Sequence, residues 1–137
     1  MRLFTLEEAN ELIPRLELIM EKLHRKGLEL REGVRSVATD IDKPLGELTL
    51  DEVLAYRPAL KALTDEMQQL VGEIEETGVQ FKGLDLGLVD FPSEIDGERR
   101  LLCWQFGEKE VGYWHTEESG FAGRQPLPHV RTRSVLQ

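Results

Sequence analysis

The sequence predicts an α+β fold: a long antiparallel helical hairpin, coiled-coil-like, followed by a small three-stranded antiparallel sheet and an irregular C-terminal tail. Apolar residues in the first half recur at helical steps of three and four, and seven of the nine aromatic residues follow residue 79. The 137 residues suit a single domain. We expect the hairpin over 1–77, the antiparallel meander with its following loop over 78–127, and the tail over 128–137.

The first helix is predicted to begin at a capping box, in which Thr5 is followed three residues later by Glu8. A heptad pattern of apolar residues follows, with Lys26 in one of its apolar positions. The segment 39–48 contains proline, glycine and aspartate and is typical of a reversal loop. The apolar positions of this helix are Leu12, Leu16, Ile19, Leu23, Leu30, Val34, Val37 and Ile41.

A second capping box, Thr49 with Glu52, opens the return helix, in which Pro58 predicts a bend. Its heptad pattern ends at residues 77–78, where Thr-Gly is a typical helix stop. Each helix of such a hairpin buries only one face against the other, so the sheet or a second copy of the chain must cover the rest. We therefore expect a homodimer formed through the helices. The apolar positions are Val53, Tyr56, Leu60, Leu63, Met67, Leu70 and Ile74.

The sheet is expected to be a meander of strands Leu88–Ile95, Glu98–Phe106 and Glu110–Thr116. Asp96-Gly97 is a favourable two-residue hairpin turn, and residues 107–110 form the second turn.

The predicted register pairs Ile95 with Glu98 in the first hairpin and Leu102 with His115 in the second. His115 and Cys103 then lie on opposite faces and cannot share a metal ion unless a bulge intervenes, so we expect a buried, inert cysteine. A slip of one residue exchanges the two faces. The face expected to pack on the helices carries Val89, Phe91, Leu102, Trp104, Phe106, Val111, Tyr113 and His115.

The segments GLVDFP, LLCWQFGEKEVGYWH and GFAGRQPL follow the helix opening FTLEEANELIPRL in this order. Over nearly its whole length the chain resembles a bacterial family of uncharacterised cytosolic proteins, domain of unknown function 2203. The resemblance implies a cytoplasmic, prokaryotic protein. It assigns no reaction, cofactor or partner, and it marks no residue as catalytic.

Composition excludes several classes of protein. The net charge is −9 and no basic stripe is present, so we expect no nucleic-acid partner. No apolar run approaches the ~18–20 residues of a membrane span, so we expect no membrane partner. A single cysteine cannot form an intramolecular disulfide, which fits the cytoplasm.

A metal site is a weak candidate, because no standard ligand motif is present and most of the acidic residues fit solvated turns. Asp85, Asp90 and His115 are the residues to consider, with Glu108 as a further carboxylate. We therefore expect no cofactor.

Asp90 alternates with Leu88 inside an apolar strand, so its carboxylate needs a partner. Arg124 is the predicted partner, because a guanidinium binds a carboxylate through two hydrogen bonds. That pair would tie the GFAGRQPL loop to the sheet. Alternatively, Arg124 binds an anionic ligand between Gly120 and Gly123.

The leading hypothesis is a non-enzymatic, self-associating binding or interaction protein, whose small-molecule or protein partner is unknown. The alternative is a small metal-dependent or acid/base enzyme using Asp90, Glu108, His115 and Arg124. The two tryptophans fit core packing or an aromatic pocket beside His115. The candidate ligand- or partner-binding residues are Asp90, Trp104, Glu108, Trp114, His115 and Arg124.

Overall fold

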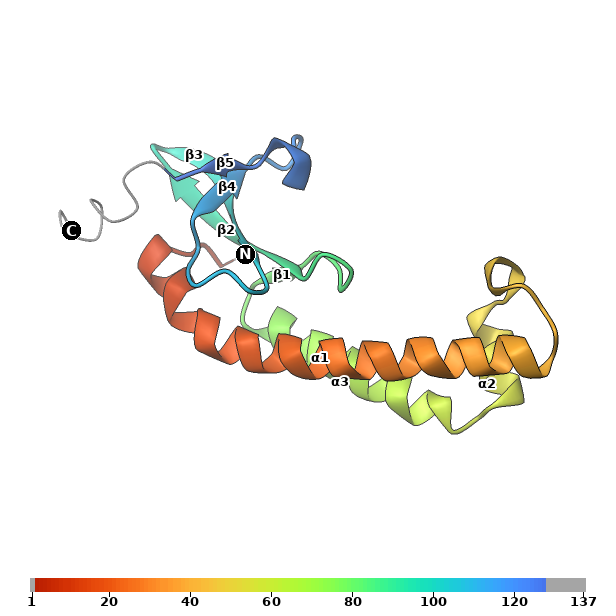
Figure 1. The fold of residues 1–137 in the computed structure, drawn as a ribbon. Coiled ribbons are helices and arrows are strands. Elements are labelled where there is room, and N and C mark those ends of the chain that lie inside the picture. Colours follow the sequence, from red (N-terminus) through yellow and green to blue (C-terminus); the bar gives the residue numbers. More distant parts are fainter. Residues whose placement is uncertain (1, 128–137) are drawn as a thin grey trace.

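A computed structural model of the protein describes residues 2–127, so the predicted tail at 128–137 lies outside the described residues. The fold is α+β, as predicted: helices α1 (Leu6–Asp40), α2 (Leu50–Tyr56) and α3 (Leu60–Glu76) precede a five-stranded antiparallel sheet (Figure 1). A short 3₁₀ turn, η1 (Leu45–Glu47), lies in the reversal between α1 and α2. Within residues 2–127, none of the helices has the length and the apolar composition of a membrane span.

Both predicted capping boxes are formed. The Thr5 hydroxyl accepts from the Glu8 backbone amide, and the Glu8 carboxylate accepts from the Thr5 amide, which satisfies two amides that no helical carbonyl reaches. Thr49 and Glu52 repeat the arrangement at the start of α2.

The return limb is divided into two helices at Pro58, where the sequence predicts only a bend. Proline has no amide hydrogen and its ring collides with the preceding turn, so α2 ends at Tyr56 and α3 begins at Leu60. Arg57 ties the break to α1 by donating to the Asp40 carboxylate at 2.9 Å. Together the three helices form an elongated arm that extends away from the sheet (Figure 1).

Helices α1 and α3 are antiparallel and approach closely. Lys26 of α1 bonds Glu66 of α3, and Gly33, further along α1, meets Leu60 at the start of α3. A Cβ atom at residue 33 would lie 2.9 Å from the Leu60 side chain, so glycine permits this approach. Helix α3 ends at Glu76, and Gly78 follows with φ of +94°, as the predicted helix stop requires.

The sheet has five strands where the sequence predicts three. The two additional edge strands have only two residues each, which is too short for a recognisable alternation of polar and apolar residues. Neighbouring strands pair in chain order: β1 (Gln80–Phe81), β2 (Leu88–Ile95), β3 (Glu98–Gln105), β4 (Tyr113–His115) and β5 (Gln125–Pro126).

The register of the first hairpin is confirmed, with Ile95 opposite Glu98. The predicted register of the second hairpin is wrong by one residue, because His115 lies opposite Leu101 and not Leu102. The chain leaves the ladder between β3 and β4, where the Val111 amide donates to the Asn10 side chain of α1 at 2.7 Å. The slip places His115 on the outer face of the sheet, away from the helices.

The inner face of the sheet packs on the helices and forms the core. Phe91 and Trp104 are fully buried there, and Phe91 meets the Phe4 ring edge to face at 5.4 Å between centroids. The Trp104 indole donates to the Glu108 carbonyl at 2.9 Å, so its one polar atom is satisfied inside the core.

Candidate functional site

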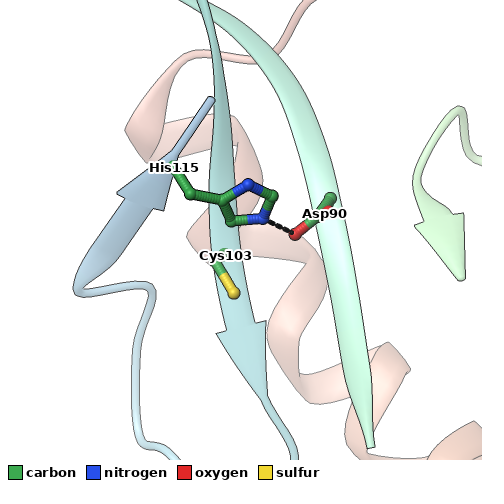
Figure 2. Close-up of side chains that lie close together, drawn as sticks. All are labelled: Asp90, Cys103 and His115. Atoms are coloured by element: carbon green, nitrogen blue, oxygen red, sulfur yellow. Dashed lines mark hydrogen bonds and ion pairs between the residues drawn. The ribbon is translucent and has the colours of Figure 1, made fainter. Parts of the chain in front are cut away.

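Three chemically reactive side chains meet on the outer face of the sheet. Asp90 of β2 lies opposite Cys103 of β3, and His115 comes from β4 beside them (Figure 2). One ligand atom from each residue lies within 4.8 Å of the other two. All three residues are buried, with exposed fractions of 2%, 1% and 4% respectively. The prediction that Cys103 and His115 face opposite sides of the sheet is therefore wrong.

The contacts of His115 restrict the protons of the His115–Asp90 pair to two arrangements. Its Nδ1 is 2.7 Å from the Thr116 carbonyl oxygen, which only accepts, so Nδ1 carries a hydrogen. Its Nε2 is 2.9 Å from Asp90 Oδ1, and that bond also needs a proton. The pair is therefore an imidazolium with a carboxylate, or a neutral imidazole with a protonated Asp90.

Cys103 holds its proton firmly. Burial raises the pKa of the thiol from 9.0 to about 12, and the neighbouring negative charge of Asp90 contributes. At neutral pH the sulfur is a thiol and a poor nucleophile.

A cleft of about 490 Å³ opens beside this cluster. Asp90 and His115 both line it, whereas Cys103 is not among its lining residues. The buried pair thus borders the cleft. The remaining lining residues are Gln80, Lys82, Leu101, Glu117 and Gly120.

Arg124 has a partner other than the predicted Asp90. Its guanidinium donates to the Glu108 carboxylate and lies 3.7 Å from the centre of the Tyr113 ring. Glu108 also accepts from the Gln105 backbone amide at 2.7 Å. Through Glu108, Arg124 thus ties its loop to the turn that follows β3, and its predicted pairing with Asp90 is wrong.

Two other candidate residues lie away from the cluster. Asp85 is exposed in the connection between β1 and β2 and is not part of the cluster of Asp90 and His115. Trp114 packs against the core on the inner face, where Arg100 lies 4.9 Å from its ring. The predicted aromatic pocket beside His115 is not formed by Trp114, because adjacent residues of a strand point to opposite faces.

The cluster offers one oxygen, one sulfur and one nitrogen donor. Carboxylate, thiolate and imidazole are the side chains that bind zinc and related transition metals. The hydrogen bond from Nδ1 to a backbone carbonyl is the usual second contact of a metal-binding histidine. Acid–base chemistry between Asp90 and His115 is the other capability of this arrangement.

A model of the family described as an uncharacterised conserved protein (DUF2203) matches residues 2–127. Neither a curated protein nor a solved structure matches the chain.

Proposed function

Since the chain belongs to the uncharacterised DUF2203 family, we propose from its outer sheet face that it is a binding protein for a transition-metal ion of the zinc class. One observation carries the proposal: ligand atoms of the buried Asp90, Cys103 and His115 lie within 4.8 Å of one another. A metal ion at the centre of the cluster would draw these donor atoms closer to one another. Each donor would then lie about 2.0–2.3 Å from the metal. The proposal replaces the expectation that the protein has no cofactor.

The orientation of His115 supports the proposal. The Thr116 carbonyl accepts from Nδ1, which directs Nε2 toward Asp90. In the neutral form of this tautomer, Nε2 presents a lone pair to the centre of the cluster. No rotation of the ring is needed to bind a metal ion, and the carbonyl keeps the ring in place.

The charge of the cluster is also suited to a divalent ion. Without metal, Asp90, His115 and the Cys103 thiol together carry no net charge in either of the two arrangements given above. With a divalent ion, the carboxylate and thiolate contribute two negative charges and the imidazole none, so the sum is again zero. Binding therefore releases two protons and leaves no uncompensated charge in a buried place.

The sulfur of Cys103 selects among metals. Magnesium and calcium prefer oxygen ligands, whereas thiolate and imidazole favour zinc and its neighbours in the first transition row. The thiol is free rather than disulfide-bonded. A reduced cysteine supports the cytoplasmic location that we propose for the protein.

The test is zinc titration of untagged protein that has been stripped with a chelator, with the bound metal measured by calorimetry and elemental analysis. We expect one zinc ion per chain. Cys103→Ser and His115→Gln should each weaken binding by at least about tenfold, because even the loss of a residue that supports a metal ligand has an effect of that size.

The matched control is His24→Gln, which removes an exposed imidazole on α1 outside the cluster. Circular dichroism and thermal unfolding establish that each variant is folded. Zinc binding that is unchanged in Cys103→Ser and His115→Gln, or no stoichiometric binding to the unaltered protein, contradicts the proposal.

A second candidate function is acid–base catalysis, favoured by the hydrogen bond between His115 and Asp90 beside the cleft. The enzyme considered from the sequence also uses Glu108 and Arg124. Those two residues bond each other, so the candidate pair is reduced to Asp90 and His115. Catalytic turnover of a small-molecule substrate by the metal-stripped protein would favour acid–base catalysis over metal binding.

We also propose that two copies associate through the helical arm, as the sequence suggests. A groove along α1 and α3 supports this proposal. It comprises cavities of about 300 and 520 Å³ that share Met67 and Leu84 among their lining residues.

A further inference from the structure

We propose that the metal site is open toward the cleft and that its free coordination position takes the oxyanion of a small molecule, a carboxylate or a phosphate, held beside Lys82. This inference depends on the proposed metal binding, and it specifies the class of ligand that the bound ion recognises. It follows from the number of protein ligands, from the direction in which the cluster is open, and from the side chains around the cleft.

The number of ligands indicates an open site. Among the described residues the cluster has three members, Asp90, Cys103 and His115. Structural zinc sites are closed by four protein ligands, whereas sites that bind water or substrate have three. A zinc ion in this cluster therefore keeps one position for a ligand that residues 2–127 do not supply.

The free coordination position of the ion faces the cleft. Asp90 and His115 both bind the proposed ion and line the cleft of about 490 Å³, whereas Cys103 does not line it. An ion held by all three thus has Cys103 on its protein side and the cleft on its open side. A cleft of this volume is suited to a small metabolite rather than to a polymer.

Lys82, which directly follows strand β1, supplies the charge that selects the ligand. Gln80 lies opposite Asp90 in the register of β1 and β2, so its side chain is on the outer face. Lys82 follows two residues later and lines the same cleft. Among the described residues the Lys82 ammonium has no ion-pair partner, so this charge is available to a ligand.

The two cations define the class of ligand. A metal ion and an ammonium group that border one cleft favour an anion whose oxygens reach both. The Gln80 amide can donate a further hydrogen bond. Glu117 lines the cleft as well, and its carboxylate accepts from a hydroxyl or amino group elsewhere on the ligand. A hydroxy acid, an amino acid or a phosphate ester has this pattern.

The experiment uses the full chain loaded with Co²⁺, a zinc substitute whose visible spectrum reports its coordination. Acetohydroxamate, acetate and inorganic phosphate are the probes. We expect each probe to change the cobalt spectrum saturably. Lys82→Met should weaken phosphate binding by roughly tenfold, since it removes a charge-assisted hydrogen bond. Lys22→Met, which alters an exposed lysine of α1, should leave it unchanged.

The possible outcomes separate this inference from the proposal on which it depends. Cobalt binding with a spectrum that no probe alters would mean that the site is closed, and it would overturn the inference while metal binding stands. Probe binding that is equal in Lys82→Met and Lys22→Met would overturn the role of Lys82. Failure to bind cobalt or zinc at all would overturn both. A response to phosphate but not to acetate identifies phosphate as the ligand chemistry, and the reverse identifies carboxylate.

Discussion

At the scale of one residue, the chemistry of Asp90 predicts that it has a partner but not which residue that partner is. A carboxylate inside an apolar strand must have a partner, and the sequence correctly predicts that it has one. The identity of the partner depends on which strand lies alongside, and that is a matter of register rather than of side-chain type. Arg124 is chemically suitable, yet His115 is the residue that β4 brings within 2.9 Å.

Cys103 is expected to be unreactive in the folded protein at neutral and mildly alkaline pH. Its pKa is raised to about 12 against 9.0 for an ordinary thiol, so at pH 8 the thiolate fraction is lower by about a thousandfold. Alkylation should therefore be far slower in the folded than in the denatured protein. The folded-state rate should rise with pH until about pH 12.

The measurement is the rate of iodoacetamide labelling, followed by mass spectrometry over a range of pH. Because this is the only cysteine of the chain, the added mass reports residue 103 without ambiguity. Equal rates in the folded and denatured protein at pH 8 would show that the thiol is not protected.

At the scale of the elements, local patterns predict most of the fold. Caps, heptads and the Asp96-Gly97 turn depend on neighbouring residues, so both capping boxes and the β2–β3 register follow from the sequence. In the β3–β4 connection, by contrast, the Val111 amide donates to Asn10, which lies 101 residues away in the chain. No local pattern contains that information, so the sequence names Asp90 and His115 as metal candidates but places Cys103 on the opposite face.

Asn10→Ala should destabilise the fold by about 1–3 kcal/mol, because it leaves the buried Val111 amide without its acceptor. It should also weaken zinc binding, since the segment that it holds leads directly into β4 and His115. Asn10→Asp keeps an oxygen acceptor at the same place and should restore most of the stability. Urea unfolding measures the free energy, and zinc titration measures the second effect.

A loss of stability in Asn10→Asp equal to that in Asn10→Ala would indicate that the hydrogen bond is not the cause. Normal zinc affinity in a destabilised Asn10→Ala would show that β4 keeps its register without this contact.

At the scale of the whole molecule, the sheet and the arm present separate surfaces. The arm groove has Arg31, Arg35 and Asp85 beside its larger cavity, where the bases outnumber the acid, and Glu75 beside its smaller one. A second copy placed antiparallel brings the basic end of each groove against the acidic end of the other. The sequence predicts the apolar faces of the helices, but it does not show which parts the sheet leaves uncovered.

Leu30→Lys should convert the proposed dimer into a monomer, because it places a charge in the half-buried apolar groove. Leu18→Lys is the matched control, since Leu18 is on the same helix, is 63% exposed and does not line the groove. Size-exclusion chromatography with light scattering over a range of concentrations gives the mass of each protein. An unaltered chain that is monomeric at every concentration would contradict self-association.

The order of strands in the sheet also has a consequence for folding. The donors of the cluster come from neighbouring strands of one meander, and Asp90 and His115 are separated by only 25 residues along the chain. Such short loops close at a small cost in chain entropy. The three metal ligands can therefore come together before segments that are distant in the sequence make contact. An ion that binds early would guide the pairing of β4 with β3, and the metal would then act as a template for the sheet as well as its ligand.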